Sequence, residues 1–256
     1  MTSELGAFLR ARRSDARLRP AHRSLGARRV SGLRREEVAA EAGISVDYYT
    51  RLEQGRETNP SDSVLRAVAR VLELEGDAVD HLFRLRATTG PLAAARSEDS
   101  EIRERSEALV GAVRPNPAYV LDRLSNVVAA NPEGLALFDG LSDEPLPRRN
   151  TCRYLVTDPR AREIFVDWED IARGAVAHLR AANADNLHDP GLRTLVDELA
   201  AKSPHFGDWW TGHVVRRRRS STKRIRTPDG TVVERRYEVL HLPDDGARMT
   251  VWLPAS

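Results

Sequence analysis

The sequence contains a single cysteine, Cys152, among its 256 residues. A lone cysteine excludes a disulfide within one chain and a metal cage built from cysteines. No run approaches the ~20 consecutive apolar residues that a membrane-spanning helix needs, and the N-terminus lacks the apolar core of a signal peptide. These absences predict a cytoplasmic protein that does not associate with membranes.

Motifs that carry out catalysis are also lacking. The seven histidines show no HExxH spacing, Cys152 has no evident partner for nucleophilic chemistry, and no glycine-rich loop could hold a phosphate. The acidic residues Asp167 and Glu169 lie two apart on a predicted helix and therefore face different ways. We expect a protein that is not an enzyme and that has neither a metal site nor a cofactor.

Charge is nearly balanced overall but unevenly placed. Lys and Arg number 40 and Asp and Glu 38, for a formal net charge of +2. From Met1 to Arg35, however, ten arginines stand against only Glu4 and Asp15. Such clustering is typical of a surface that approaches the phosphate backbone of a nucleic acid.

Residues 33–55, LRREEVAAEAGISVDYYTRLEQG, have the pattern of a helix-turn-helix. Apolar residues spaced for one buried stripe precede Gly43, which suits the left-handed residue that ends a helix. Ser45 then offers a hydroxyl to the free amides that open a second helix. Two short helices joined in this way predict a helix-turn-helix.

The second of these helices has a polar face unlike that of a packed core helix. Tyr49 and Leu52 face inward, and the opposite face carries Val46, Asp47, Tyr48 and Arg51. Arg51 could donate to guanine O6 and N7, while Asp47 could accept from cytosine N4 or instead orient Arg51. The alternative is an ordinary solvated helical face, which any amphipathic pair of helices would show.

A family resemblance favours DNA binding. The stretch RREEVAAEAGISVDYYTRLEQGRETNPS resembles the XRE-type helix-turn-helix of bacterial regulators, and its flanks resemble the N-terminal half of the MmyB-like regulators of actinobacteria. The match depends on GLRREEVA, DYYTRLEQGR and NPSDSVLRAVARVLEL. It implies an all-α, five-helix domain in which Arg13 pairs with Glu53.

The same resemblance implies a set of DNA contacts. Arg35 and Ser45 match phosphate-contacting positions, and Val46, Asp47, Tyr48 and Arg51 match base-reading positions; Arg34 and Arg56 complete the candidate set. Arg34 stands where many XRE domains have a serine cap. We therefore expect the first motif helix to begin without a side-chain cap, or to use water or a phosphate oxygen.

The pattern changes after a break at residues 88–100, which contain Gly90, Pro91 and the polar run SEDS. A helix is expected over 102–113, two strands over 118–130, a helix opened by Asn131-Pro132, and helices over 159–182 and 190–201. Three strands follow, over 213–226, 231–242 and 248–253. Together they predict an α+β, PAS-like domain with a five-stranded antiparallel sheet and helices on one side. The expected organisation is a DNA-binding domain at 1–87, a linker at 88–100 and a sensor domain at 101–256.

This second half also resembles the MmyB-like regulators, in NPAYVLDRLSNVVAANP, DPRAREIFVDWEDIARGAVAHLRAA and DPGLRTLVDELAAKSPHFGDWWTGHVV. The resemblance implies a PAS-like domain that holds an apolar, fatty-acid-like molecule, with or without a carboxylate. Side chains with an apolar body and a polar tip suit such a pocket, although each alone could be ordinary core. The candidate ligand-binding residues are Tyr119, Phe138, Phe165, Trp168, Trp210, His213 and Tyr237.

A second basic cluster, Arg216 to Arg219 with Lys223, Arg224 and Arg226, allows two interpretations. It could protect an edge strand by charge, or one arginine could pair with a ligand carboxylate or with an acidic patch. The sequence as a whole predicts a bacterial transcription regulator that binds a palindromic operator as a homodimer and is controlled by a small apolar effector. The alternative is a regulator whose C-terminal half is a protein-interaction and dimerisation module without a small ligand.

Overall fold

The computed structural model describes residues 3–16, 32–57, 59–87, 99–214, 220–242 and 246–254. By contact, the chain divides into two compact units. The first comprises Met1–Pro91 with the short segments Ala184–Leu187 and Gly212–Val215, and the second comprises Leu92–Asn183, His188–Thr211 and Arg216–Ser256. The proposed linker, 88–100, lies largely outside the described residues, so its place in the domain organisation stays a prediction.

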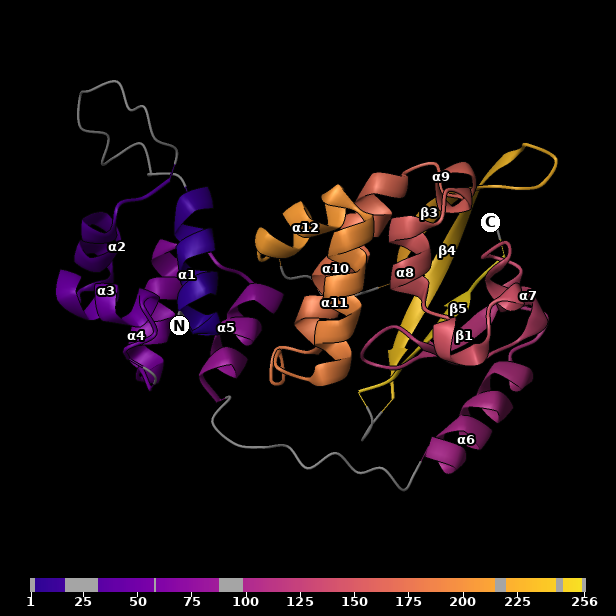
Figure 1. Ribbon diagram of the computed structural model, residues 1–256, viewed down its shortest axis with the longest axis horizontal. Coiled ribbons are helices and arrows are strands. Elements are labelled where there is room, and N and C mark those ends of the chain that lie inside the picture. Colours follow the sequence, from indigo (N-terminus) through magenta and orange to yellow (C-terminus); the bar gives the residue numbers. More distant parts are fainter. Residues whose placement is uncertain are drawn as a thin grey trace. The chain divides into compact units, whose positions relative to one another are not determined.

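The described part of the first unit is all-α (Figure 1). Its helices are α1 (Glu4–Asp15), α2 (Arg35–Ala42), α3 (Val46–Glu53), α4 (Asp62–Val71) and α5 (Asp77–Ala87). A capping serine precedes each of α1, α3 and α4, and its hydroxyl accepts a hydrogen bond from a backbone amide of the first turn. These serines are Ser3, Ser45 and Ser61. These caps satisfy amides that the helix itself leaves without a partner.

The core of the first unit is closed by a close crossing of α1 and α3. Phe8, Leu9, Tyr49 and Leu52 are each 0% exposed. Gly6 is required at the crossing because a Cβ there would come within 2.3 Å of the Glu53 carbonyl oxygen. The two helices therefore hold each other at a fixed depth, and α3 keeps its outer face free.

The second unit is α+β, as the sequence predicts. Its helices are α6 (Asp99–Ala112), α7 (Pro132–Leu135), α8 (Thr151–Thr157), α9 (Arg160–Ile164), α10 (Trp168–Ala182), α11 (Pro190–Lys202) and α12 (Pro204–Thr211), with short 3-10 turns η2 (Leu141–Asp143) and η3 (Leu146–Arg148). Its strands are β1 (Ala118–Leu121), β2 (Val127–Ala130), β3 (Ser221–Arg226), β4 (Val232–His241) and β5 (Arg248–Trp252). They form one antiparallel sheet in the order β2-β1-β5-β4-β3.

Helices cover both faces of this sheet, whereas the sequence pattern predicts helices on one side only. Strand register places Ala118, Val120 and Met249 on one face, where they pack with Val110 of α6. The opposite face carries Tyr119 and Trp252, and the ring of Phe138, which follows α7, packs on Tyr119 there. The expectation failed because α6 lies before the first strand and its pattern alone does not say which face it covers.

Two helix and strand boundaries also differ from expectation. The helix predicted over 159–182 is interrupted between Ile164 and Trp168, where Phe165 bridges to Ile225 of β3 and the Val166 amide donates to the Arg224 carbonyl at 3.2 Å. The strand predicted from residue 213 begins only at Ser221, since α12 runs to Thr211 and His213 adopts a positive φ of 50° in a turn.

The bridging segment also protects the edge of the sheet. Besides the backbone bond to Arg224, the Arg224 side chain donates to Asp167. Backbone pairing and the charged side chain of Arg224 thus both hinder another strand from adding to β3. This agrees with the interpretation that the basic cluster protects an edge strand. Arg216 to Arg219 lie outside the described residues.

A three-membered ion-pair network joins α8 to α11. Glu198 accepts from Arg153 Nε at 3.0 Å and Nη2 at 2.9 Å, and from Lys202 Nζ at 2.8 Å. The hydrogen bond from Arg153, opposed by burial and helped by Lys202, lowers the pKa of Glu198 from 4.5 to about 2. Because the folded pKa is the lower one, this stabilisation is present above the unfolded pKa and is lost as pH falls toward the folded pKa.

We therefore expect Glu198→Gln to lower the free energy of unfolding of the second unit at pH 7 by about 0.5–1 kcal/mol, the upper range for a solvent-accessible pair with bidentate geometry. The difference from wild type should shrink between pH 5 and pH 3, as measured by urea unfolding at several pH values. Asp197→Asn, which neutralises an exposed carboxylate of the same helix, is the matched control. A difference that stays constant down to pH 3 would contradict the ion-pair explanation.

Candidate nucleic-acid interface and candidate ligand site

The turn between α2 and α3 has the geometry that its sequence predicts. Gly43 is left-handed, with φ of 69°, and its amide donates to the Ala40 carbonyl. The Ile44 amide donates to the Ala39 carbonyl at 3.0 Å, and Ser45 Oγ accepts from the Tyr48 amide at 3.1 Å. This turn sets the angle at which α3 leaves α2.

The two faces of α3 separate as expected. Tyr49 and Leu52 are fully buried, whereas Val46 is 42% exposed although it is a large apolar residue. The side chains of Asp47 and Arg51 are 80% and 48% exposed. The outer face of α3 therefore offers an apolar group, a carboxylate, a phenol and a guanidinium on a rigid helix.

Arg51 is held by two neighbours on this face. Its Nε lies 3.6 Å from Asp47 Oδ2, and its Cζ lies 5.8 Å from the centre of the Tyr48 ring. Partial burial and the nearby Glu57 carboxylate raise the pKa of Tyr48, while Arg51 opposes that shift. Tyr48 therefore remains a neutral phenol that can donate a hydrogen bond.

Glu53 is the last residue of α3 and anchors the C-terminal end of this helix. Its carboxylate is 0% exposed and accepts from Arg13 Nε at 2.5 Å and from Arg35 Nε at 2.8 Å. Burial would raise the pKa of Glu53, but hydrogen bonds from the two arginines lower it below its usual value. The pairing of Arg13 with Glu53 is confirmed. The bond from Arg35, a predicted phosphate contact, was not expected, although its side chain remains 40% exposed.

The first turn of α2 is capped in a way that the sequence reasoning missed. The Arg34 side chain makes no cap hydrogen bond, as expected, but Glu37 Oε2 accepts from the Arg34 amide at 2.7 Å. Glutamate three residues after the capping residue, here Arg34, is the signal that could have shown this. The side chains of Arg34 and Arg56 are exposed and stay candidate phosphate contacts.

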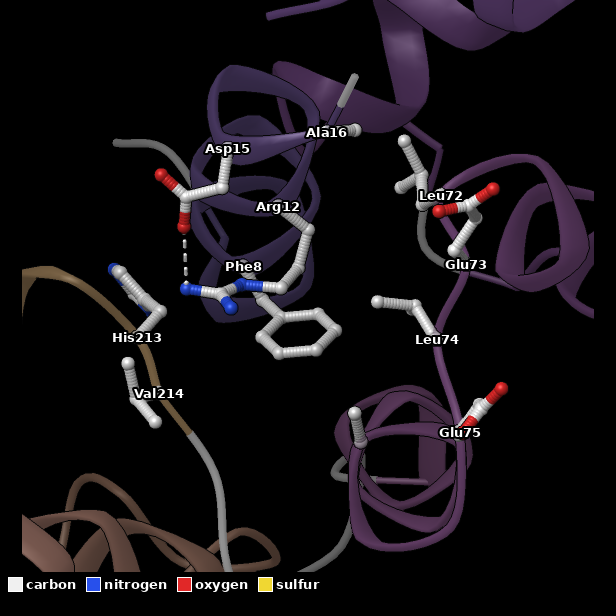
Figure 2. Close-up of a pocket in the computed structure, with 11 residues that line it drawn as sticks. Phe8, Arg12, Asp15, Ala16, Leu72, Glu73, Leu74, Glu75, His213 and Val214 are labelled. Carbon is white, nitrogen blue, oxygen red and sulfur yellow. Dashed lines mark ion pairs between the residues drawn. The ribbon is translucent and has the colours of Figure 1, made fainter. Parts of the chain in front are cut away.

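A cavity in the first unit lies beside α1 and the turn between α4 and α5 (Figure 2). The Arg12 guanidinium crosses it, 3.0 Å from Asp15 Oδ2 and near the ring of Phe8. Burial lowers the pKa of Arg12, and Asp15 opposes this. His213, a predicted ligand residue, also lines this cavity and belongs by contact to the first unit. The other six candidate ligand residues belong to the second unit.

Four of the seven candidate ligand residues meet on the face of the sheet opposite to α6. The ring of Phe138 lies 5.4 Å from that of Tyr119 and 6.1 Å from that of Phe165. Trp252 links Tyr237, at 5.3 Å between ring centres, to Tyr119, whose hydroxyl accepts from the indole at 3.4 Å. We call this group the aromatic cluster: Tyr119, Phe138, Phe165, Tyr237 and Trp252, with Tyr154, whose ring lies 5.5 Å from Phe138.

Two polar groups enter the aromatic cluster, and neither is among the seven candidate ligand residues. Lys223 Nζ lies 4.6 Å from the Tyr237 ring centre, 5.4 Å from Trp252 and 5.9 Å from Phe165. Tyr154 is 4% exposed, and its hydroxyl has no hydrogen-bond partner among the described residues. Burial, followed by the Asp158 carboxylate, raises the pKa of Tyr154, so the phenol stays protonated. Strand alternation could have placed Lys223 on the same face as Tyr237, but only the fold brings Phe165 and Trp252 to that face as well.

Trp168 and Trp210 make their contacts elsewhere. The Trp168 indole donates to the Leu155 carbonyl at 2.6 Å, and Arg162 lies 4.2 Å above its ring. Trp210 stacks on Phe206 at 5.8 Å and carries Arg180 at 4.2 Å. Neither indole makes a ring contact with the aromatic cluster in the part of the chain that is described.

Comparison with protein families decides the class of protein. Residues 4–82 match a helix-turn-helix domain, and residues 102–256 match the MmyB-like transcription regulator ligand binding domain. The chain is an MmyB-like transcription regulator. No curated protein matches it.

Membership of the MmyB-like regulators gives each unit its role. The helix-turn-helix makes this a DNA-binding regulator, and the second half is its ligand-binding domain. Both matched families are regulatory and neither consists of enzymes. Across the described ranges, no three His, Cys, Asp or Glu side chains gather as metal ligands would. None of the described helices is long and apolar enough to cross a membrane.

Proposed function

We propose that this MmyB-like regulator reads a palindromic operator through the outer face of α3 and is controlled by an apolar ligand in the aromatic cluster. The observation that supports DNA reading best is the rigid, capped α3, with Val46, Asp47, Tyr48 and Arg51 on its exposed face. A helix of this kind fits the major groove, where each base pair presents a distinct pattern of donors and acceptors. Ser45, Arg34, Arg35 and Arg56 would contact phosphates.

A single helix-turn-helix buries too little DNA for tight and specific binding. The proposal therefore includes a homodimer, in the cytoplasm, on half-sites ~10 base pairs apart or a multiple of that spacing. The ligand would act by population shift: it binds one arrangement of the chain better, and so changes how often two α3 helices stand at groove spacing. Selection of bound fragments from random duplexes tests this part, since a dimer should return two inverted half-sites and a monomer only one.

For the ligand, the proposal rests on the aromatic cluster. Tyr119, Phe138, Phe165 and Tyr237 supply apolar surface, and Lys223 supplies a cation at its edge. A buried phenol without a partner is costly, so the Tyr154 hydroxyl is a second point that a ligand could satisfy. These features suit a fatty-acid-like molecule whose carboxylate meets Lys223. Trp168, Trp210 and His213 are left out of the proposed site, because their contacts lie elsewhere.

We expect native mass spectrometry of the full chain purified from bacteria to show apolar acids bound to it. Lys223→Ala should lower the affinity for dodecanoate about 10-fold, the loss of one charge-assisted contact, and leave that for dodecanol nearly unchanged. Trp168→Ala, which removes a ring outside the cluster, is the matched control.

The second candidate is a C-terminal half that binds a protein and no small molecule. It is favoured if no apolar molecule accompanies the protein and if a lipid and antibiotic-like library leaves the melting temperature unchanged. Equal loss of dodecanoate binding in Lys223→Ala and Trp168→Ala would contradict the placement of the ligand, but not its existence.

A further inference from the structure

Arg51 is the side chain of α3 best suited to read a base, and its surroundings restrict how it can do so. The Asp47 carboxylate faces its Nε at 3.6 Å, and the Tyr48 ring lies on one side of the guanidinium at 5.8 Å. The Tyr48 ring restricts the orientation of the guanidinium plane, and the Asp47 carboxylate restricts which edge of the guanidinium can face a base. Both neighbours come from the same helix, so the arrangement is built before any DNA arrives.

This arrangement leaves a particular pair of donors available. A guanidinium has five N–H donors in a planar fork. With Nε facing Asp47, the two terminal Nη groups are the donors that remain for a base. Two parallel N–H groups in one plane match the O6 and N7 acceptors on the major-groove edge of guanine. The Asp47 carboxylate thus favours contact with a base through the two Nη groups, which is the contact that guanine requires.

The alternative role of Asp47, acceptance from cytosine N4, is less consistent with this geometry. In water, a pair with side chains 80% and 48% exposed contributes only about 0–1 kcal/mol. In the groove, however, water is excluded and phosphates surround the helix, so an unpaired carboxylate would be repelled. Asp47 is best accommodated there by keeping Arg51 as its partner.

We infer that Asp47 and Tyr48 are positioning residues, which fix the edge and the plane of Arg51 so that Arg51 alone reads a guanine. This inference rests on the proposed function, in which α3 reads DNA. It assigns the specificity of this face at one base pair to three side chains acting as a unit. Such units show strong non-additivity when their members are changed in pairs.

The test measures base preference in the full chain. A duplex selected by the wild-type protein is varied at every position, and Kd is measured for wild type, Asp47→Ala, Arg51→Ala and the double variant. Asp47→Ala should reduce the preference for guanine at the position read by Arg51 about 5-fold, since it weakens one bidentate contact. In the Arg51→Ala background, the same change should alter that preference less than about 2-fold, because nothing is left to position.

The readout is the ratio of affinities between bases and not affinity itself. Removal of a carboxylate near phosphates strengthens binding to all sequences alike, which leaves the ratio unaffected. Tyr48→Phe, which keeps the ring, should preserve the preference, and Tyr48→Leu should weaken it. Melting temperatures close to wild type are expected for Asp47→Ala, since this side chain is mostly exposed.

The outcomes separate the inference from the function on which it rests. If Asp47→Ala changes preference at a different base pair, and its effect adds to that of Arg51→Ala, Asp47 reads a base itself and the inference is overturned while the proposed function stands. A wild-type protein without any preference among duplexes would overturn both.

Discussion

Replacement of Arg51 by alanine is expected to weaken binding to the preferred duplex by about 1–3 kcal/mol and to relax base preference at one position. The reason is the loss of two parallel donors that only an arginine supplies in this geometry. The side chain is 48% exposed on the outer face of α3, so the fold should be unaffected. Kd values for the selected duplex and its single-base variants give the measurement.

Arg34→Ala is the matched comparison for Arg51→Ala. Arg34 is exposed at the start of α2, and its side chain makes no cap hydrogen bond. As a phosphate contact, it should weaken all duplexes alike and reduce the salt dependence of binding by about one counterion. Arg35 is a poorer comparison because its Nε is bonded to Glu53. Identical effects of Arg34→Ala and Arg51→Ala on base preference would contradict the roles assigned to them.

Glu53→Gln is expected to destabilise the first unit by about 3 kcal/mol, as loss of one charge from a buried ion pair does. The carboxylate is fully buried and satisfies both Arg13 and Arg35, so a neutral amide leaves two cations without an anion. Hydrogen exchange in the full chain should therefore accelerate in α1, α2 and α3. DNA affinity should fall together with stability, because α3 loses the ion pairs that anchor its C-terminal end.

Glu36→Gln provides the control, since it removes the same charge from an exposed position of α2. Its stability should stay within about 0.5 kcal/mol of wild type. If Glu53→Gln proves equally mild, the network of Arg13, Glu53 and Arg35 does not hold α3 in place.

The helix-turn-helix could be predicted from sequence because its determinants are local. Gly43 and Ser45 act on residues next to them in the chain, and the buried stripe of each helix repeats within a few residues. Arg13 and Glu53 were paired through family resemblance, not through spacing. Arg35 escaped notice as a second partner of Glu53, because two cations at one buried carboxylate cannot be read from a helical pattern.

The ligand-binding unit was harder to predict because long-range contacts override local ones. The bridge from Phe165 to Ile225 interrupts the helix predicted over 159–182, and no residue near Phe165 in the sequence indicates such a bridge. Trp168 has the spacing of a core residue, yet it stands at the first turn of α10 and donates to Leu155. From its sequence, Lys223 is interpreted as a charge that protects an edge strand. The fold places it beside Tyr237 and Trp252.

The most direct test of the account is to replace each guanine of the selected duplex, one at a time, by 7-deazaguanine, which lacks the N7 acceptor. The wild-type full chain should lose affinity about 5-fold or more at one guanine in each half-site, and Arg51→Ala should lose none there. Equal losses in the two proteins, or no loss at any guanine, would show that Arg51 on α3 does not read the operator.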